Sequence, residues 1–142
     1  MPIDMARKFK PIRIAVLTIS DSRGRAEDTS GDLLAEYVAN AGHQLGHRRI
    51  VKDDVDVIAQ KLRQWIADPQ IDCVISTGGT GLTGRDVAPE AFARVWDKEI
   101  PGFGELFLCR RVKKLKLRKG GSFPTFLVLD GRCTTSLPWT LE

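Results

Sequence analysis

Apolar runs alternate with amphipathic segments along the first hundred residues of this chain. The run 12–19 is rich in branched residues and predicts a largely buried strand, and further strands are predicted within 44–51 and at 71–76. Two intervening segments carry apolar residues at helical spacing: Leu33, Leu34, Tyr37, Val38 and Ala41 in the first, and Val57, Ile58, Leu62, Trp65 and Ile66 in the second.

Residues that begin or end helices stand at the limits of these segments. The segment 28–30 offers N-caps for the first helix, Gly42 suits its C-terminal end, and Pro69 ends the second helix. Pro89 fits the first turn of a third helix. The apolar residues of that helix are Phe92, Val95 and Trp96. Strands that alternate with such helices predict an α/β domain with a parallel sheet and helices on both faces.

Three polar loops follow the three predicted strands: 20–24, the pair Asp53 and Asp54, and 77–86. The carboxyl ends of parallel strands meet at one edge of a sheet, which is where such sheets bind ligands. We therefore expect one ligand site that all three loops share. Capping of the second helix is the alternative role for Asp53 and Asp54.

The third loop has the composition of a phosphate-binding segment. Residues 76–86 hold four glycines and three threonines, and they end in Arg85 and Asp86. Glycine lets backbone N–H groups approach an anion, the arginine adds positive charge, and the carboxylate is a candidate metal ligand. A plain turn is the alternative, since the loop matches neither the nucleotide P-loop nor the dinucleotide fingerprint.

Length and composition describe an ordinary globular domain. The chain has 142 residues, 42% of them hydrophobic, and holds no apolar run long enough to span a bilayer and no signal-like N-terminus. Its three cysteines lack metal-ligand spacing, and we expect Cys73 to be a core thiol in a reducing, cytoplasmic setting. His43 and His47 flank a glycine-broken helix end and are not expected to bind metal. Arg48 and Arg49 suggest an ordinary charge pair at a strand end.

Charge is distributed unevenly along the chain. Residues 1–107 hold 14 Lys and Arg against 16 Asp and Glu, whereas residues 108–142 hold 8 against 2. The basic excess therefore belongs to the C-terminal segment, and the body lacks the composition of a nucleic-acid-binding surface.

The segment 78–90 resembles the signature of the molybdopterin-binding family that includes molybdenum cofactor biosynthesis proteins B and G and the gephyrin-type domains. The segments 18–23, 28–31, 50–54 and 97–107 extend the resemblance, which is strongest to the protein B branch and covers 12–107. It implies a three-layer αβα fold with a mostly parallel sheet and assembly into homotrimers or homohexamers. Other cofactor-biosynthesis proteins are possible partners, while nucleic acid and membranes are not expected.

The resemblance also implies a chemistry. Family members bind molybdopterin, and in the active ones its terminal phosphate attacks the α-phosphorus of Mg-ATP, giving adenylylated molybdopterin and pyrophosphate. Asp53 and Asp86 occupy the catalytic carboxylate positions, with Mg²⁺ near them. Substrate and nucleotide binding is implied for a larger set: Ser20, Ser22, Ser30, Thr77, Gly78, Gly79, Thr80, Gly81 and Glu105. A non-catalytic molybdopterin-binding or carrier protein is the alternative.

The resemblance stops after Phe107, so we divide the chain into a family-like domain, 1–107, and a divergent basic tail, 108–142. Three interpretations of the tail stay open. It is a frameshifted translation that inactivates the protein, or a genuine segment in which 126–129 completes the sheet. The third is a basic arm that binds anionic membrane or nucleic acid.

Overall fold

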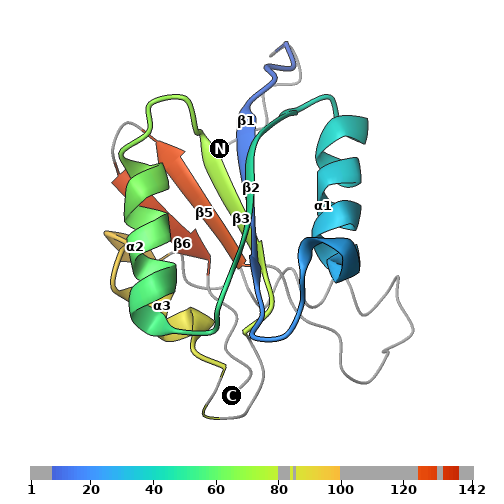
Figure 1. Cartoon of the computed structure of the whole chain (residues 1–142). Coiled ribbons are helices and arrows are strands. Elements are labelled where there is room, and N and C mark those ends of the chain that lie inside the picture. Colours follow the sequence, from blue (N-terminus) through green and yellow to red (C-terminus); the bar gives the residue numbers. More distant parts are fainter. Residues whose placement is uncertain (1–7, 80–83, 85, 100–124, 131–132, 138–142) are drawn as a thin grey trace, which may run out of the picture.

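The computed structural model describes residues 8–79, 84, 86–99, 125–130 and 133–137 (Figure 1). Its elements in chain order are β1 (Arg13–Ile19), a 3-10 turn η1 (Arg25–Glu27), α1 (Thr29–Asn40), β2 (Gln44–Val51), α2 (Val55–Ile66), β3 (Cys73–Thr77), α3 (Ala88–Ala93), β4 (Lys98–Glu99), β5 (Thr125–Asp130) and β6 (Cys133–Leu137). The order of strands and helices predicted for the first hundred residues is confirmed.

The six strands form one mixed sheet in the order β2-β1-β3-β5-β6-β4. β1 pairs in parallel with β2 and β3, and β4 pairs in parallel with β6. β5 runs antiparallel to both β3 and β6. The strand that one of the three interpretations of the tail placed at 126–129 lies inside β5 and adjoins the parallel core, while the boundary at residue 107 stays a prediction.

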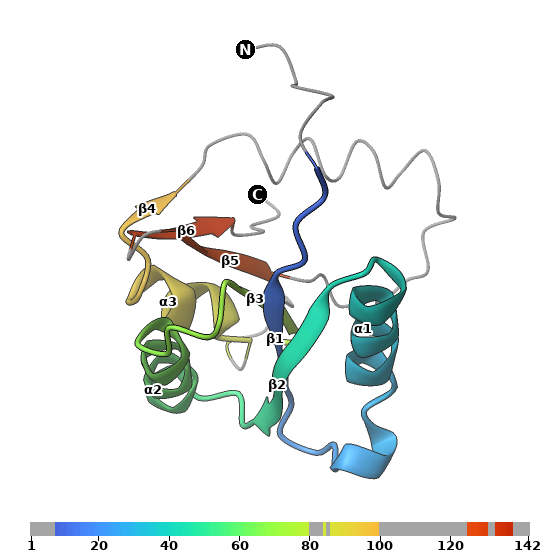
Figure 2. The same ribbon diagram turned by 90° about the horizontal axis from the view of Figure 1, so that it is seen from above.

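Helices cover both faces of the sheet, with α1 on one face and α2 and α3 on the other (Figure 2). The larger buried cluster lies under α2 and α3 and includes Leu17, Ile58 and Phe92. A smaller cluster on the α1 side contains Ile14 and Val38 with Cys73. This is the predicted three-layer α/β arrangement.

β1 occupies the centre of the parallel part, and both of its faces are buried. Every residue of β1 after Arg13 is buried, as a strand covered on two sides requires. β2, at the edge of the sheet, is mostly exposed and carries several polar side chains. Gly42 lies two residues after the last residue of α1 and has a φ of 81°. Glycine adopts this left-handed backbone easily, which suits the predicted end of the helix.

α3 is shorter than the sequence predicts. It ends at Ala93, so Val95 and Trp96 lie beyond the helix, although both still pack against the larger core cluster. Their backbone N–H groups donate to the carbonyl of Phe92, so the chain continues as a turn. Apolar spacing at 92, 95 and 96 therefore marks burial rather than helix length.

Cys73 is a buried thiol in β3, as predicted. Burial, with a smaller contribution from the charge of Asp72, raises the pKa of Cys73 to about 11. The thiol therefore stays protonated at neutral pH and packs as a small apolar side chain. No helix among the described residues is long and apolar enough to cross a membrane.

Candidate functional site

The three polar loops meet at the carboxyl ends of β1, β2 and β3. The backbone N–H of Ser20 donates to the carbonyl of Val51 at 2.9 Å, which joins the first loop to the end of β2. The backbone N–H of Asp53 donates to Oδ1 of Asp21 at 3.0 Å. The predicted convergence of the loops is therefore present in the structure.

The glycine loop starts with a turn that requires glycine twice. Gly78 and Gly79 have φ angles of 94° and 64°, in the left-handed region. A Cβ at Gly78 would lie 2.1 Å from the carbonyl oxygen of Ile19, so the backbone of this turn lies directly against the end of β1. The carbonyl of Gly79 accepts the N–H of Ala88 at 3.0 Å, which ties the turn to the start of α3.

The Asp53 carboxylate lies at the junction of the second and third loops. Its Oδ1 accepts the backbone N–H of Val87 at 3.1 Å, and a Cβ on Gly79 would lie 3.0 Å from the same oxygen. Asp86 directly precedes Val87 and is partly buried, as Asp53 is. The structure thus places the Asp53 carboxylate against the segment that holds Asp86, while the catalytic roles of both residues stay predictions.

Asp54 has the other role that the sequence left open. Its Oδ1 accepts the N–H groups of Asp56 and Val57 at 2.9 and 3.0 Å, so it caps α2. Asp53 and Asp54 therefore have different roles. Asp53 lies next to the glycine turn, and Asp54 caps α2.

The remaining predicted site residues are spread along the same edge. The Oγ of Ser20 accepts the N–H of Arg23 at 3.2 Å, whereas Ser22 is exposed. Ser30 lies half-buried in the first turn of α1, and Thr77, at the end of β3, is buried. Three predicted site residues lie outside the described part of the chain: Thr80, Gly81 and Glu105.

A buried polar network beside α1 is the feature that the sequence did not predict. Asp28 caps the helix through a 3.0 Å hydrogen bond from the N–H of Gly31, as predicted, but its side chain is completely buried. Its Oδ2 also accepts from Oγ1 of Thr18 at 2.9 Å and from Nη2 of Arg48 at 2.7 Å. Nη1 of Arg48 contacts the carboxylate of Asp32.

Electrostatics in this network favour the ionised pair. Burial raises the pKa of Asp28, but hydrogen bonds from Arg48, Gly31 and Thr18 outweigh it, and the pKa lies below its ordinary value. The pKa of Arg48 is raised, chiefly by its hydrogen bond to Asp28. The interpretation of Arg48 as an ordinary strand-end charge is therefore wrong, because its side chain is only 10% exposed. Arg49, by contrast, is exposed.

The histidines lie apart from this site. His43 accepts the N–H of Ile12 through Nδ1, whereas His47 stacks on Trp65 and its Nε2 lies 3.5 Å from Oδ2 of Asp68. Within the described ranges, no three His, Cys, Asp or Glu side chains group as a metal site. The Mg²⁺ expected at Asp53 and Asp86 stays a prediction.

A family model described as a probable molybdopterin binding domain matches residues 15–136. The chain belongs to this family. The match includes β5 and all of β6 but its last residue, as well as the loops at the carboxyl ends of β1 to β3. The site described above therefore lies within the molybdopterin-binding domain.

Relatives of known name agree with this assignment. The chain is 44% identical over 103 residues to molybdenum cofactor biosynthesis protein B of Escherichia coli, and 46% identical over 98 residues to the Bacillus cereus protein of that name. These matches cover 72% and 69% of the chain but 61% and 58% of the relatives, so the chain spans about three-fifths of their length. A crystal structure of a molybdenum cofactor biosynthesis protein B superposes with a TM-score of 0.77 at 36% identity, covering 92% of this chain and 81% of that one.

Proposed function

We propose that this protein acts in molybdenum cofactor biosynthesis, where it binds molybdopterin and transfers an adenylyl group from Mg-ATP to its terminal phosphate. One observation carries the proposal: in a molybdopterin-binding domain, the Asp53 carboxylate adjoins the Gly78-Gly79 turn and the segment that holds Asp86. A glycine turn can bind phosphate through its backbone N–H groups, and neighbouring carboxylates can hold the metal ion that phosphoryl chemistry uses.

The proposed reaction depends on alignment of phosphates and on control of charge. An oxygen of the pterin phosphate forms a bond to the α-phosphorus of ATP, and the bond from that phosphorus to the bridging oxygen breaks as pyrophosphate leaves. Glycine at 78 and 79 lets this turn lie against the end of β1 and beside Asp53. The backbone N–H groups of the glycine loop would then bind the phosphates. Ser20, Ser22 and Ser30 would line the pocket on the α1 side.

Carboxylate oxygens with substrate phosphates are a donor set that Mg²⁺ prefers, so Asp53 and Asp86 fit this ion. When bound, the ion would offset negative charge at the reacting phosphates. Asp53 is already fixed by the N–H of Val87. We therefore assign it to the positioning of the Asp86 segment as well as to the metal.

Single-atom exchanges at the carboxylates test this assignment. Asp86→Asn should reduce pyrophosphate release from Mg-ATP in the presence of molybdopterin by orders of magnitude, and Asp53→Asn should do the same. Asp54→Asn is the matched control, because asparagine caps helices as well as aspartate does and this variant should keep wild-type activity. Equal losses in Asp53→Asn and Asp54→Asn would contradict the assignment.

Binding measurements separate catalysis from carriage. Molybdopterin should raise the thermal unfolding midpoint of the protein, and turnover should accompany binding. Binding without pyrophosphate release would support the alternative of a non-catalytic molybdopterin carrier. An unfolding midpoint that molybdopterin leaves unchanged would contradict both roles.

We also propose that the active unit is a homotrimer or homohexamer in the cytoplasm, because the resemblance to the family implies such assemblies. Light scattering on the purified protein tests the assembly, and a monomer at micromolar concentration would contradict it.

The coding DNA around codons 105–110 tests whether residues 108–142 are a frameshifted translation. A one-base change that restores the family pattern would establish a frameshift.

A further inference from the structure

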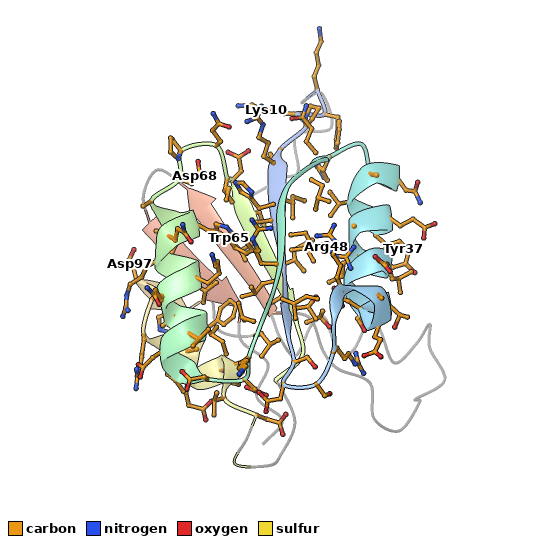
Figure 3. The ribbon with its side chains drawn as sticks, in the orientation of Figure 1. Lys10, Tyr37, Arg48, Trp65, Asp68 and Asp97 are labelled. Carbon is orange, nitrogen blue, oxygen red and sulfur yellow. The ribbon has the colours of Figure 1, made fainter. Side chains whose placement is uncertain are left out.

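A buried ion pair fixes the start of α1 next to the end of β1. Asp28 is 0% exposed, and the side chain of Arg48, its partner, is only 10% exposed. Figure 3 shows Arg48 reaching from β2 toward α1. Burial of two charges is costly unless both are well hydrogen-bonded, so such a pair specifies a geometry more than it adds stability.

The guanidinium of Arg48 holds the first turn of α1 at several points. Nη2 donates to both Oδ2 and the carbonyl oxygen of Asp28, at 2.7 and 3.1 Å, while Nη1 pairs with the carboxylate of Asp32. A lysine offers no planar fork and cannot reproduce this arrangement. The contact is therefore specific for arginine and not only for positive charge.

Gly31 completes this arrangement from the helix side. Its N–H donates to Oδ1 of Asp28, and a Cβ there would lie 2.1 Å from Oδ2 of Asp28 and 2.8 Å from Oγ1 of Thr18. No side chain larger than hydrogen fits without displacing the carboxylate. The network thus depends on Thr18, Asp28, Gly31 and Arg48 together.

The segment 20–30 depends on this network for its position. At one end the N–H of Ser20 is bound to Val51, and at the other end Asp28 is bound to Thr18 and Arg48. Residues 21–27 between these two anchors are exposed. Few apolar contacts therefore hold the middle of the segment, and its placement is set mainly from its ends.

We propose that Arg48 and Asp28 are positioning residues that hold Ser20, Ser22 and Ser30 in place for the pterin and nucleotide site. The inference rests on the proposed function for its consequence in binding, but the positioning itself is a property of the free protein. Arg48 acts through Asp28 and not by touching substrate.

Hydrogen exchange on the free protein tests the positioning directly. In Arg48→Gln, amides within 20–32 should exchange at least tenfold faster than in the wild type, with amides of β1 and β3 unchanged. Arg49→Gln is the matched control, because Arg49 is the exposed neighbour in the same strand and should leave exchange as in the wild type. Gly31→Ala should give the same faster exchange, because its methyl group would displace the Asp28 carboxylate from the helix side of the network.

Kinetics test the consequence. In Arg48→Gln the KM for molybdopterin should rise at least tenfold, while kcat falls by a smaller factor, and Arg48→Lys should recover only part of the loss. If Arg48→Gln is unfolded at the assay temperature, Arg48→Lys and Gly31→Ala provide the same comparison. Unchanged exchange and KM in folded Arg48 variants, or equal effects in Arg49→Gln, would overturn the inference. A wild-type protein that never binds molybdopterin would instead overturn the proposed function, whatever the exchange shows.

Discussion

Replacement of Gly79 with alanine tests how tightly the glycine turn and the Asp53 carboxylate are coupled. The φ of Gly79 is 64°, and an added Cβ would lie 3.0 Å from Oδ1 of Asp53, 3.0 Å from Cγ2 of Ile19 and 3.1 Å from Cβ of Ala88. All three distances are shorter than an ordinary van der Waals contact. The new methyl group must therefore push at least one neighbour away.

Two costs add in this variant. A left-handed backbone costs a non-glycine residue about 1–2 kcal/mol. Displacement of Asp53 weakens its hydrogen bond from the N–H of Val87, and hydrogen bonds to charged groups contribute about 1.5–3 kcal/mol. Since the carboxylate gives way only partly, we expect Gly79→Ala to lower the free energy of unfolding by about 2–4 kcal/mol.

Urea unfolding of Gly79→Ala and wild type measures this loss, and a thermal melt should show a drop on the order of 10 °C. Gly24→Ala is the matched control. Gly24 has a φ of −82° and no atom within 4 Å of an added Cβ, so alanine there should be neutral or slightly stabilising. A loss below about 1 kcal/mol in Gly79→Ala would refute the reasoning, because the left-handed backbone alone costs that much.

Two further predictions concern buried titratable groups. The pKa of Asp28 is lowered on folding, so its contribution to stability is complete above the unfolded pKa of about 3.9 and is lost as the pH falls through the folded pKa. Wild type should therefore lose stability below about pH 5 more steeply than Asp28→Asn, and parallel pH profiles would contradict this. The Cys73 thiol, with a pKa of about 11, should react with iodoacetamide at pH 8 at least about a hundredfold more slowly in the folded protein than in urea. A Cys109→Ser and Cys133→Ser background isolates this thiol, and equal rates in the two states would contradict its burial.

The order of elements was predictable because the central strands bury both faces. The run that became β1 is apolar from Ile14 to Leu17, and the caps at Asp28 and Asp54 mark helix starts that the structure confirms. The apolar run at 126–129 is consistent with a strand, but it does not indicate whether that strand runs parallel or antiparallel to its neighbour. Its antiparallel pairing with β3 depends on how the chain arrives there, which an apolar run does not specify.

The buried role of Arg48 was not predictable, because it depends on register. Arg13 lies opposite Gln44, and an unbroken pairing would place Arg48 opposite Leu17, on the face that α2 and α3 cover. A register shift between Ile14 and Ala15 instead places it opposite Val16, so its side chain reaches α1. One irregular residue in a strand thus reverses the face of every later side chain.

The two aspartates after β2 illustrate a second limit. Either is chemically able to cap α2, since the two stand side by side just before its first residue, Val55. The structure assigns the cap to Asp54, whose backbone is extended with φ −135° and ψ 127°, and turns Asp53 toward the glycine turn. The residues alone placed the pair at the site edge without dividing the roles, and only the resemblance to the family singled out Asp53.

The most direct test of the proposed function is to incubate the purified protein with molybdopterin, ATP and Mg²⁺ and to measure pyrophosphate and adenylylated molybdopterin together. We expect the two products in equal amounts, formed only when molybdopterin is present, and abolished in Asp86→Asn. Bound molybdopterin with neither product would contradict adenylyl transfer and leave the protein as a carrier.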